Sequence, residues 1–337
     1  MENVENEYLA SHIVKMLKLD IKQPALVKAE KNGRIPQAVR RRKGRVDFRY
    51  WPTKSLPKIG AVFGKFKKPL KTEVFCVYAP KGGIGKSCFT FNFSRVLALH
   101  DLRVLVIGMD FQCTLSKNFG LSYEDDSQIP LSLFDCFAKE NKTLKDLILK
   151  TDIPNLFFIP ESNELNVLDN YLFAKNRREY LLKDALEEIK GVFDVVIIDC
   201  PPYWNQSVTN ALVAANRIIA PINSDGESYH SFKIYMRELK KFMERLKKGF
   251  DSVKFIANYV DLRNKYTTDF KNKLISEYGP VFTSAYLRDS VTVKEAGSAR
   301  KSVIEYSPSS NVADDFYNAM FEVWSDVETE GEETLDS

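Results

Sequence analysis

Residues 74–87 read Val-Phe-Cys-Val-Tyr-Ala-Pro-Lys-Gly-Gly-Ile-Gly-Lys-Ser, and this stretch decides the fold of the chain. The run from Val74 to Tyr78 is apolar and rich in β-branched and aromatic residues, which predicts a buried strand. The residues from Pro80 to Gly85 interrupt regular structure, and their three glycines allow positive φ and close approach to a ligand. From Lys86 onward the apolar residues are spaced as in a helix. A strand, a glycine-rich turn and a helix form a phosphate cradle, because backbone N–H groups and the positive end of the helix converge there.

In such a cradle, Lys86 reaches the terminal phosphates and the Ser87 hydroxyl helps to hold Mg²⁺. The general P-loop pattern, G-x-x-x-x-G-K-[ST], fails here because its first glycine falls at Pro80. The observed stretch from Lys81 to Ser87 instead resembles the deviant P-loop of the ParA/MinD ATPases, K-G-G-x-G-K-[ST]. The alternative is a glycine-rich turn with solvent-exposed lysines. The resemblance implies that ATP is bound by Lys81, Gly82, Gly83, Ile84, Gly85, Lys86, Ser87 and Cys88.

A second apolar run, Leu102 to Gly108, predicts a buried strand that leads into Asp110. The ParA family reads D-x-D-P-Q here, so Asp110 matches, whereas Gly108 replaces the first Asp and Phe111 replaces the Pro. By resemblance, Asp110 positions the attacking water near the γ-phosphate and Mg²⁺. Its alternative role is to cap the next helix. With Lys81 and Lys86, Asp110 completes the expected catalytic set.

The most hydrophobic strand is predicted from Phe193 to Asp199 and is followed by Cys200-Pro201-Pro202. It resembles the Walker B strand and the D-x-P-P of the family, which implies that Asp199 holds Mg²⁺, mainly through water, together with Ser87 and Asp110. An acidic residue that ends a buried strand by chance is the alternative.

Further along the chain, Asn258 lies in a segment that resembles the N-x-x-D-x-R of the family, and its amide could read an adenine edge. The block from Tyr286 to Pro308 resembles the closing block of the family, so the resemblance covers roughly residues 73–324. Strands and helices alternate, and the carboxylates follow the ends of strands. The expected fold is therefore a doubly wound α/β domain with a mostly parallel sheet, of the P-loop NTPase type.

The charge is uneven along the chain. Residues 1–72 carry 18 Lys and Arg against 6 Asp and Glu, whereas residues 324–337 carry 6 acids and no base. We therefore expect three parts: a basic DNA-binding segment (1–70), an ATPase domain (71–325) and an acidic tail (326–337). The front segment resembles the winged helix-turn-helix of MerR-type proteins and the extension of larger plasmid ParA proteins. A solvated basic linker is the alternative, which the interleaved aromatics from Phe48 to Trp51 disfavour. Its candidate DNA contacts are Arg40, Arg41, Arg42, Lys43, Arg45 and Arg49.

The resemblance also implies partners. In the family the first lysine of the loop, here Lys81, crosses a dimer interface to the nucleotide of the partner copy, so we expect an ATP-dependent homodimer. That dimer would bind DNA without sequence preference, which makes affinity fall steeply with salt. Hydrolysis would be weak until a ParB-type centromere-binding protein stimulates it. The candidate contacts to nonspecific DNA are Arg245, Lys247, Lys248, Arg288, Lys294, Arg300 and Lys301.

Three other functions remain open. A nucleotide-switched repressor with little turnover is compatible with the departures at Gly108 and Phe111. A MinD-like positioning ATPase is disfavoured because an acidic tail is repelled by anionic lipid. A NifH-type reductase is disfavoured by the lack of suitably placed cluster cysteines.

We expect a cytoplasmic, nucleoid-associated protein without a membrane span. The first residues lack a basic region typical of a secretory signal, and no run of about 18 apolar residues occurs. The five cysteines are scattered without a C-x-x-C pair, which is typical of free thiols in a reducing compartment.

Overall fold

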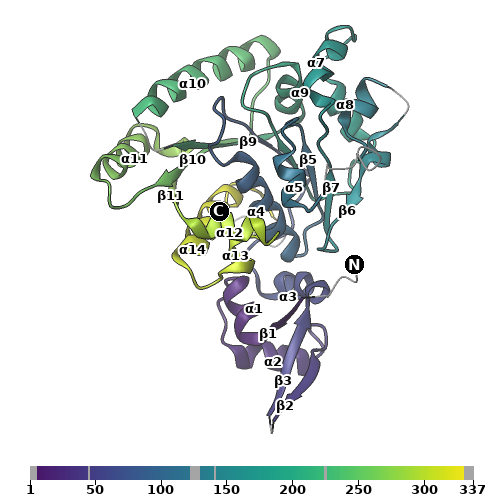
Figure 1. Cartoon of the computed structure of the whole chain (residues 1–337), viewed down its shortest axis with the longest axis vertical. Helices are drawn as coiled ribbons and strands as arrows, with labels where there is room; N and C mark the ends of the chain where they lie inside the picture. Colours follow the sequence, from purple (N-terminus) through teal and green to yellow (C-terminus); the bar gives the residue numbers. More distant parts are fainter. Residues whose placement is uncertain (1–5, 45, 122–129, 140–141, 224–225, 330–337) are drawn as a thin grey trace, which may run out of the picture.

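The computed structural model describes residues 6–44, 46–121, 130–139, 142–223 and 226–329. Their centre is an eight-stranded sheet in the order β11-β10-β9-β4-β8-β5-β7-β6 (Figure 1). All neighbours pair in parallel except the short edge strand β6, which is antiparallel to β7. The strands are β4 (Glu73–Val77), β5 (Val104–Gly108), β6 (Leu149–Lys150), β7 (Leu156–Ile159), β8 (Val195–Asp199), β9 (Arg217–Asn223), β10 (Ser252–Val260) and β11 (Phe282–Arg288).

Helices cover both faces of this sheet, because its strands are apolar on both sides. Along β4, Phe75 and Val77 belong to one core cluster, whereas Cys76 and Tyr78 belong to the other. The doubly wound, mostly parallel fold is therefore confirmed. The helices are α4 (Lys86–Leu99), α5 (Thr114–Asn118), α6 (Leu133–Phe137), α7 (Leu165–Phe173), α8 (Leu181–Glu187), α9 (Gln206–Ala214), α10 (Gly226–Leu246), α11 (Lys265–Tyr278), α12 (Val291–Ser298), α13 (Val303–Tyr306) and α14 (Asn311–Trp324).

None of the helices in the described ranges combines the length and the apolar character that crossing a lipid bilayer requires.

The N-terminal residues form a small unit with its own antiparallel sheet, in the order β1-β3-β2. The alternating pattern of residues 46–51 predicts a strand, and the apolar residues after Pro52 predict a short helix; both are present. The approximately helical spacing of apolar residues predicts a helical segment over residues 1–30. This prediction is wrong for Glu7–Leu9, which pair with β3 so that Tyr8 lies opposite Trp51. The elements are β1 (Glu7–Leu9), α1 (Ala10–Met16), α2 (Gln23–Lys31), β2 (Val39–Lys43), β3 (Val46–Pro52) and α3 (Leu56–Phe63).

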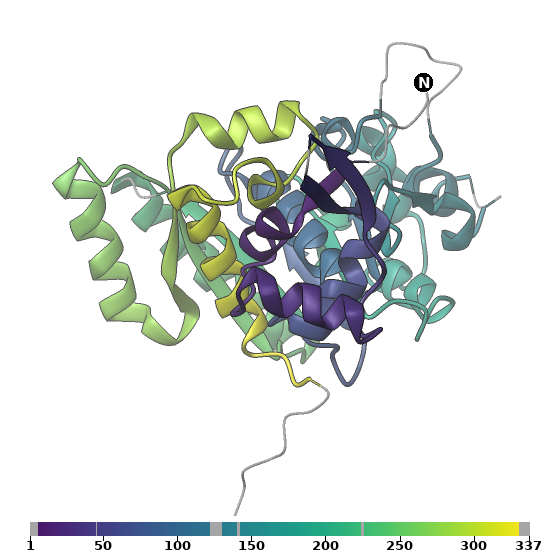
Figure 2. The same cartoon turned by 90° about the horizontal axis from the view of Figure 1, so that it is seen from below.

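This unit packs directly on the central α/β domain, at the end of α4 that lies away from the glycine-rich loop (Figure 1). Seen from below, it lies over the central domain beside α14 (Figure 2). Trp51 and Phe66 belong to the same core cluster as Phe75 of the sheet. The approach is so close that a Cβ on Gly60 would lie 2.1 Å from the carbonyl oxygen of Leu99. The two parts therefore share one hydrophobic core.

The end of the described chain also packs at this boundary. Leu70 donates its N–H to the carbonyl of Glu328, and Val327 and Thr329 are buried. Of the expected acidic tail at 326–337, residues 326–329 thus belong to the packed structure, because they pair with the segment that links the two parts. Residues 330–337 lie outside the described ranges.

The buried His100, at the end of α4, is a pH-sensitive point of this shared core. Its ring contacts Phe66, with ring centroids 4.9 Å apart, and its Nδ1 lies 2.7 Å from the carbonyl oxygen of Val96. Burial lowers the pKa of His100 to about 4. The folded protein therefore keeps a neutral ring at a pH where the unfolded chain already binds a proton.

We predict that stability falls as the pH drops from about 6.5 to about 4, with a contribution of roughly 3 kcal/mol from His100 at the lower end. His100→Asn keeps a donor for the Val96 carbonyl but has no titrating ring, so its free energy of unfolding should change less over this range. Urea unfolding of both proteins at several pH values measures the difference. Equal pH dependence would contradict the assignment.

Candidate functional site

The glycine-rich loop joins the end of β4 to the start of α4, as predicted. Gly83 and Gly85 have φ of +69° and +84°, a conformation that favours glycine. At Gly85 a Cβ would also lie 2.4 Å from the Nδ2 of Asn258. Gly82 does not have positive φ, so the loop needs only two of its three glycines for their backbone freedom.

Lys86 is buried inside the curl of this loop. Its ammonium group donates a hydrogen bond to the carbonyl oxygen of Lys81 at 2.9 Å. Burial lowers the pKa of Lys86, and the nearby carboxylates of Asp199 and Asp110 oppose that shift. The ammonium group is thus desolvated at the point where an anion would lie, which strengthens its interaction with phosphate. Lys81 itself is half-buried at the front of the loop.

Asp199 lies at the end of β8, level with the ends of its two neighbouring strands. In the register of the sheet it is opposite Val77 on one side and Gly108 on the other. Its Oδ1 accepts a hydrogen bond from the Thr90 hydroxyl at 2.9 Å, and the Ser87 hydroxyl also bonds to this carboxylate. Burial raises the pKa of Asp199 to about 6.

The second oxygen of Asp199 supports a metal role. Among the described residues, no donor reaches its buried Oδ2. A buried oxygen of this kind fits a divalent cation beside the Ser87 hydroxyl. No group of three or more His, Cys, Asp and Glu side chains in the described ranges is arranged to hold a metal ion. A cation here would therefore take its other ligands from a bound phosphate group and from water.

Asp110 faces the same cavity, which has a volume of about 250 Å³. Its Oδ1 accepts the N–H of Gln112 at 3.1 Å, which holds the turn after β5. The following helix begins after Cys113, and no side chain caps it. The alternative that Asp110 caps this helix is therefore wrong. The cavity is lined by Gly82, Gly83, Ile84, Gly85, Lys86, Ser87, Cys88, Asp110, Thr114, Pro202 and Tyr259.

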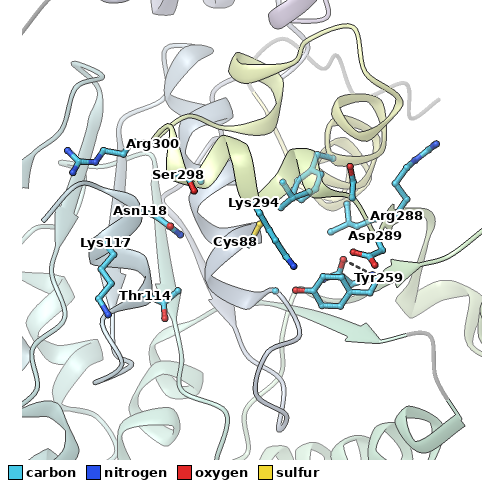
Figure 3. Close-up of a pocket in the computed structure, with 17 residues that line it drawn as sticks. Cys88, Thr114, Lys117, Asn118, Tyr259, Arg288, Asp289, Lys294, Ser298 and Arg300 are labelled. Atoms are coloured by element: carbon cyan, nitrogen blue, oxygen red, sulfur yellow. Dashed lines mark hydrogen bonds between the residues drawn. The ribbon is translucent and has the colours of Figure 1, made fainter. Parts of the chain in front are cut away.

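A larger cavity of about 590 Å³ adjoins the loop on the side of α12. In Figure 3, Lys117, Asn118 and Arg300 lie on one side of it, and Tyr259, Arg288 and Asp289 lie on the other. Its position next to Gly85 and Cys88 suits the base and sugar of a nucleotide.

Asn258 holds the loop from this side. Its Nδ2 donates to the carbonyl oxygen of Ile84 at 2.8 Å, and its Oδ1 accepts the N–H of Tyr259 at 2.8 Å. The role of Asn258 as a reader of adenine stays a prediction, since in this conformation its amide bonds to the protein. Sequence reasoning missed Tyr259, whose φ of +52° turns the ring toward the loop. No local pattern indicates such a backbone conformation in a tyrosine.

The basic residues expected to contact nonspecific DNA fall into two groups rather than one. Arg288, Lys294 and Arg300 line the large cavity, and Lys301 follows them in the chain. Arg245, Lys247 and Lys248 lie at and after the end of α10, where Arg245 borders a different groove. The guanidinium of Arg288 also pairs with both oxygens of Asp315. The contact of these seven residues with nonspecific DNA stays a prediction.

The candidate DNA contacts in the N-terminal unit differ in exposure and in their ion pairs. Arg40 and Arg42 have exposed side chains on β2. Arg41 pairs with Glu7, and Arg49 pairs with the buried Glu30 at 3.0 Å. Lys43 ends β2, and Arg45 lies outside the described residues. Arg40 and Arg42 are thus the best placed of this set to meet a ligand.

Known proteins resemble this chain over more than half of its length. A family model described as an AAA domain matches residues 72–252. The chain is 28% identical over 235 residues to the cell division protein PomZ of Myxococcus xanthus. The match covers 70% of this chain and 72% of PomZ. The chain is also 29% identical over 236 residues to the chromosome partitioning protein ParA of Caulobacter vibrioides. That match covers 69% of this chain and 87% of ParA.

Solved structures share the fold. Apo McdA from Cyanothece superimposes with a TM-score of 0.66 at 20% identity, covering 75% of this chain and 99% of McdA. A putative plasmid partition protein from Borrelia burgdorferi B31, bound to AMPPNP, superimposes with a TM-score of 0.63 at 19% identity. The match covers 76% of this chain and 99% of the partition protein.

We predict that Asn258→Ala weakens the binding of a nucleoside triphosphate about tenfold, because the loop loses its hydrogen bond at the Ile84 carbonyl and the N–H of Tyr259 loses its acceptor. Titration with a fluorescent nucleotide measures the dissociation constant. Asn166→Ala, an exposed position on α7, is the control and should bind like the wild type. Unchanged affinity of Asn258→Ala would contradict the role of this amide.

Proposed function

This chain belongs to the ParA family of partition ATPases, within the AAA-domain family whose model it matches over more than half of its length, and from that premise we propose that it hydrolyses ATP to segregate DNA. One observation carries the proposal. The buried Lys86 and the carboxylates of Asp110 and Asp199 meet around a positive-φ glycine loop at the ends of three adjacent strands. This is the set of groups that phosphoryl transfer to water requires.

Each residue of the site has a separate role in the proposed hydrolysis of ATP. The backbone of the loop and Lys86 bind the phosphates and neutralise their charge. Ser87 and the open oxygen of Asp199 would hold Mg²⁺, which supplies further charge neutralisation to the phosphates. Asp110, half-exposed in the same cavity, orients the water for attack. Because most of this catalysis is positioning and electrostatics, its rate depends on how rigidly these groups are held.

We further propose that two ATP-bound copies form a dimer in which Lys81 of each copy contacts the nucleotide of the other. Lys81 is partly exposed at the front of the loop, while its carbonyl is held by Lys86 within the same copy. A lysine donated in this way adds positive charge to the phosphates only when the second copy is present, as an arginine finger does.

The ATP-bound dimer would bind DNA without sequence preference and would act in the cytoplasm on the nucleoid. A ParB-type centromere-binding protein would stimulate its weak hydrolysis. The exposed Arg40 and Arg42 on β2 would add binding to an operator, and hence autorepression.

A second candidate is a repressor that responds to nucleotide with little turnover. The observation in its favour is α4, which begins in the loop at Lys86 and ends beneath the N-terminal unit next to Gly60. A shift of this helix on ATP binding could reach the basic hairpin. Measuring ATP turnover with DNA and partner separates the two functions, since only the first requires hydrolysis.

We predict that Lys81→Ala binds ATP as a monomer but no longer dimerises with it, because the partner's phosphates lose a positive charge. Light scattering with ATP, ADP and no nucleotide measures the mass. Lys240→Ala removes a lysine with a side chain 79% exposed on α10 and should dimerise normally. Normal ATP-dependent dimerisation of Lys81→Ala would overturn the dimer proposal.

We predict that Arg40→Glu/Arg42→Glu loses binding to the DNA upstream of its own reading frame, while ATP-dependent binding to a random duplex persists. Point substitutions are preferable to deleting residues 1–72, because the deletion would expose the shared core around Phe66 and Ile59. Binding of both duplexes is measured across a salt titration. Arg177→Glu/Arg178→Glu is the charge-matched control. If that control loses the same binding, the effect is one of net charge and the hairpin assignment is wrong.

A further inference from the structure

Glu161 is a buried acidic residue that the proposed mechanism does not yet use. It follows β7 by two residues, and its exposed fraction is 0%. Its Oε2 accepts the N–H of Ser116 at 2.9 Å, and its own N–H donates to the Ser116 hydroxyl at 3.0 Å. Ser116 lies in α5, the helix that follows the loop of Asp110. This reciprocal pair therefore ties the end of β7 to the segment that carries Asp110.

The side chain of Glu161 occupies the space above Gly108. A Cβ on Gly108 would lie 2.3 Å from the Cγ of Glu161 and 3.0 Å from its Cδ. Any side chain at position 108 would therefore displace this carboxyl. Gly108 is opposite Asp199 in the register and precedes Asp110 by two residues. The carboxyl of Glu161 thus lies over the end of β5, the strand that pairs with β8 and precedes Asp110.

The electrostatics agree with this placement. Burial, followed by the charge of Asp199, raises the pKa of Glu161 to about 8, and Asp110 adds to the shift. Three carboxyl groups from three adjacent strand ends are therefore close enough to influence one another. Burying a carboxyl group costs free energy, and the bonds to Ser116 compensate only part of its desolvation. A role in the site would explain why the group is buried there.

We propose that Glu161 is a positioning residue for hydrolysis, which supplies from β7 a carboxyl above Gly108 and fixes the Asp110 loop through Ser116. The inference rests on the proposed function, because it deepens the role of the same site. It also explains why Gly108 departs from the D-x-D-P-Q pattern: the carboxyl at this place comes from the neighbouring strand, and only glycine leaves room for it.

The first test compares three substitutions in the full-length protein. Glu161→Leu keeps apolar volume but removes the acceptor for the Ser116 N–H, so kcat for ATP should fall at least tenfold while the dissociation constant changes less than threefold. Glu161→Ala should behave in the same way. Glu161→Gln keeps an oxygen acceptor for the Ser116 N–H but lacks the carboxyl group, so its kcat should fall less than that of Glu161→Leu and Glu161→Ala. A purely structural role would instead lower affinity, kcat and Tm together in all three proteins.

The second test moves the carboxyl back to β5. Gly108→Asp alone should lose stability and activity, because its side chain overlaps Glu161. The double variant Gly108→Asp/Glu161→Ala has room for the new carboxyl and should show a higher kcat than either single variant. A double variant no better than the singles would overturn the proposal.

A readout without turnover separates this inference from the proposed function. Hydrogen exchange of the backbone amides in residues 109–116 should be faster in Glu161→Leu than in the wild type, and unchanged in Glu161→Gln. If the wild type hydrolyses no ATP but this exchange pattern holds, the ATPase assignment fails, and with it the role in hydrolysis, while the tie between Glu161 and the Asp110 loop stands. If the wild type hydrolyses ATP and Glu161→Leu matches it in both rate and exchange, the role of Glu161 is wrong.

Discussion

The alignment of three parallel strand ends is the constraint on which the rest of the site depends. The register places Val77, Asp199 and Gly108 side by side at the carboxyl edge of β4, β8 and β5. Because the strands are parallel, the loops that follow them emerge on the same side and can meet around one ligand. A slip of one residue between β8 and its neighbours would turn Asp199 to the opposite face of the sheet. The apolar residues on both faces of these strands therefore fix the position of the carboxylate that would hold the metal.

Helix α4 connects the site at these strand ends to the rest of the molecule. Nearly all its side chains are buried, because the sheet lies on one side and the N-terminal unit and α13 pack around the other. Arg95, in the middle of the helix, bonds to Glu305 at 2.6 and 2.8 Å and to both oxygens of Asp152 at 2.7 Å. Burial alone would raise the pKa of Glu305, but the charge of Arg95 holds it below its ordinary value. Removing Arg95 would leave the buried Glu305 carboxylate without its positive partner, so this ion pair ties α13 to α4.

Burying the polar groups of the site also costs desolvation free energy. Some of these groups have more hydrogen-bond partners to offset that cost than others. Lys86 has a backbone carbonyl as its partner, and Asp199 has two hydroxyls on one oxygen. Burial raises the pKa of both Asp199 and Glu161; hydrogen bonds and the charge of Lys86 oppose the shift at Asp199, whereas the charge of Asp199 adds to the shift at Glu161. A bound cation and nucleotide would change this balance, since positive charge favours the ionised carboxylates and phosphates favour the charged lysine. The site is thus held by packing in a state that a charged ligand would stabilise.

The strands β4, β5 and β8 and the glycine loop could be predicted from the sequence, as could the positions of Lys86, Asp110 and Asp199 beside the ends of these strands. These features are local: each depends on a short apolar run and on the residues that directly follow it. Only the tertiary structure decided that Asn258 holds the loop, that Arg288 pairs with Asp315, and that the front unit shares the core of the ATPase fold. The same is true of Glu161, which lies 53 positions after Gly108 in the chain yet fills the space above it. Such contacts join residues far apart in sequence, so they follow from how the elements pack and leave no local pattern to read.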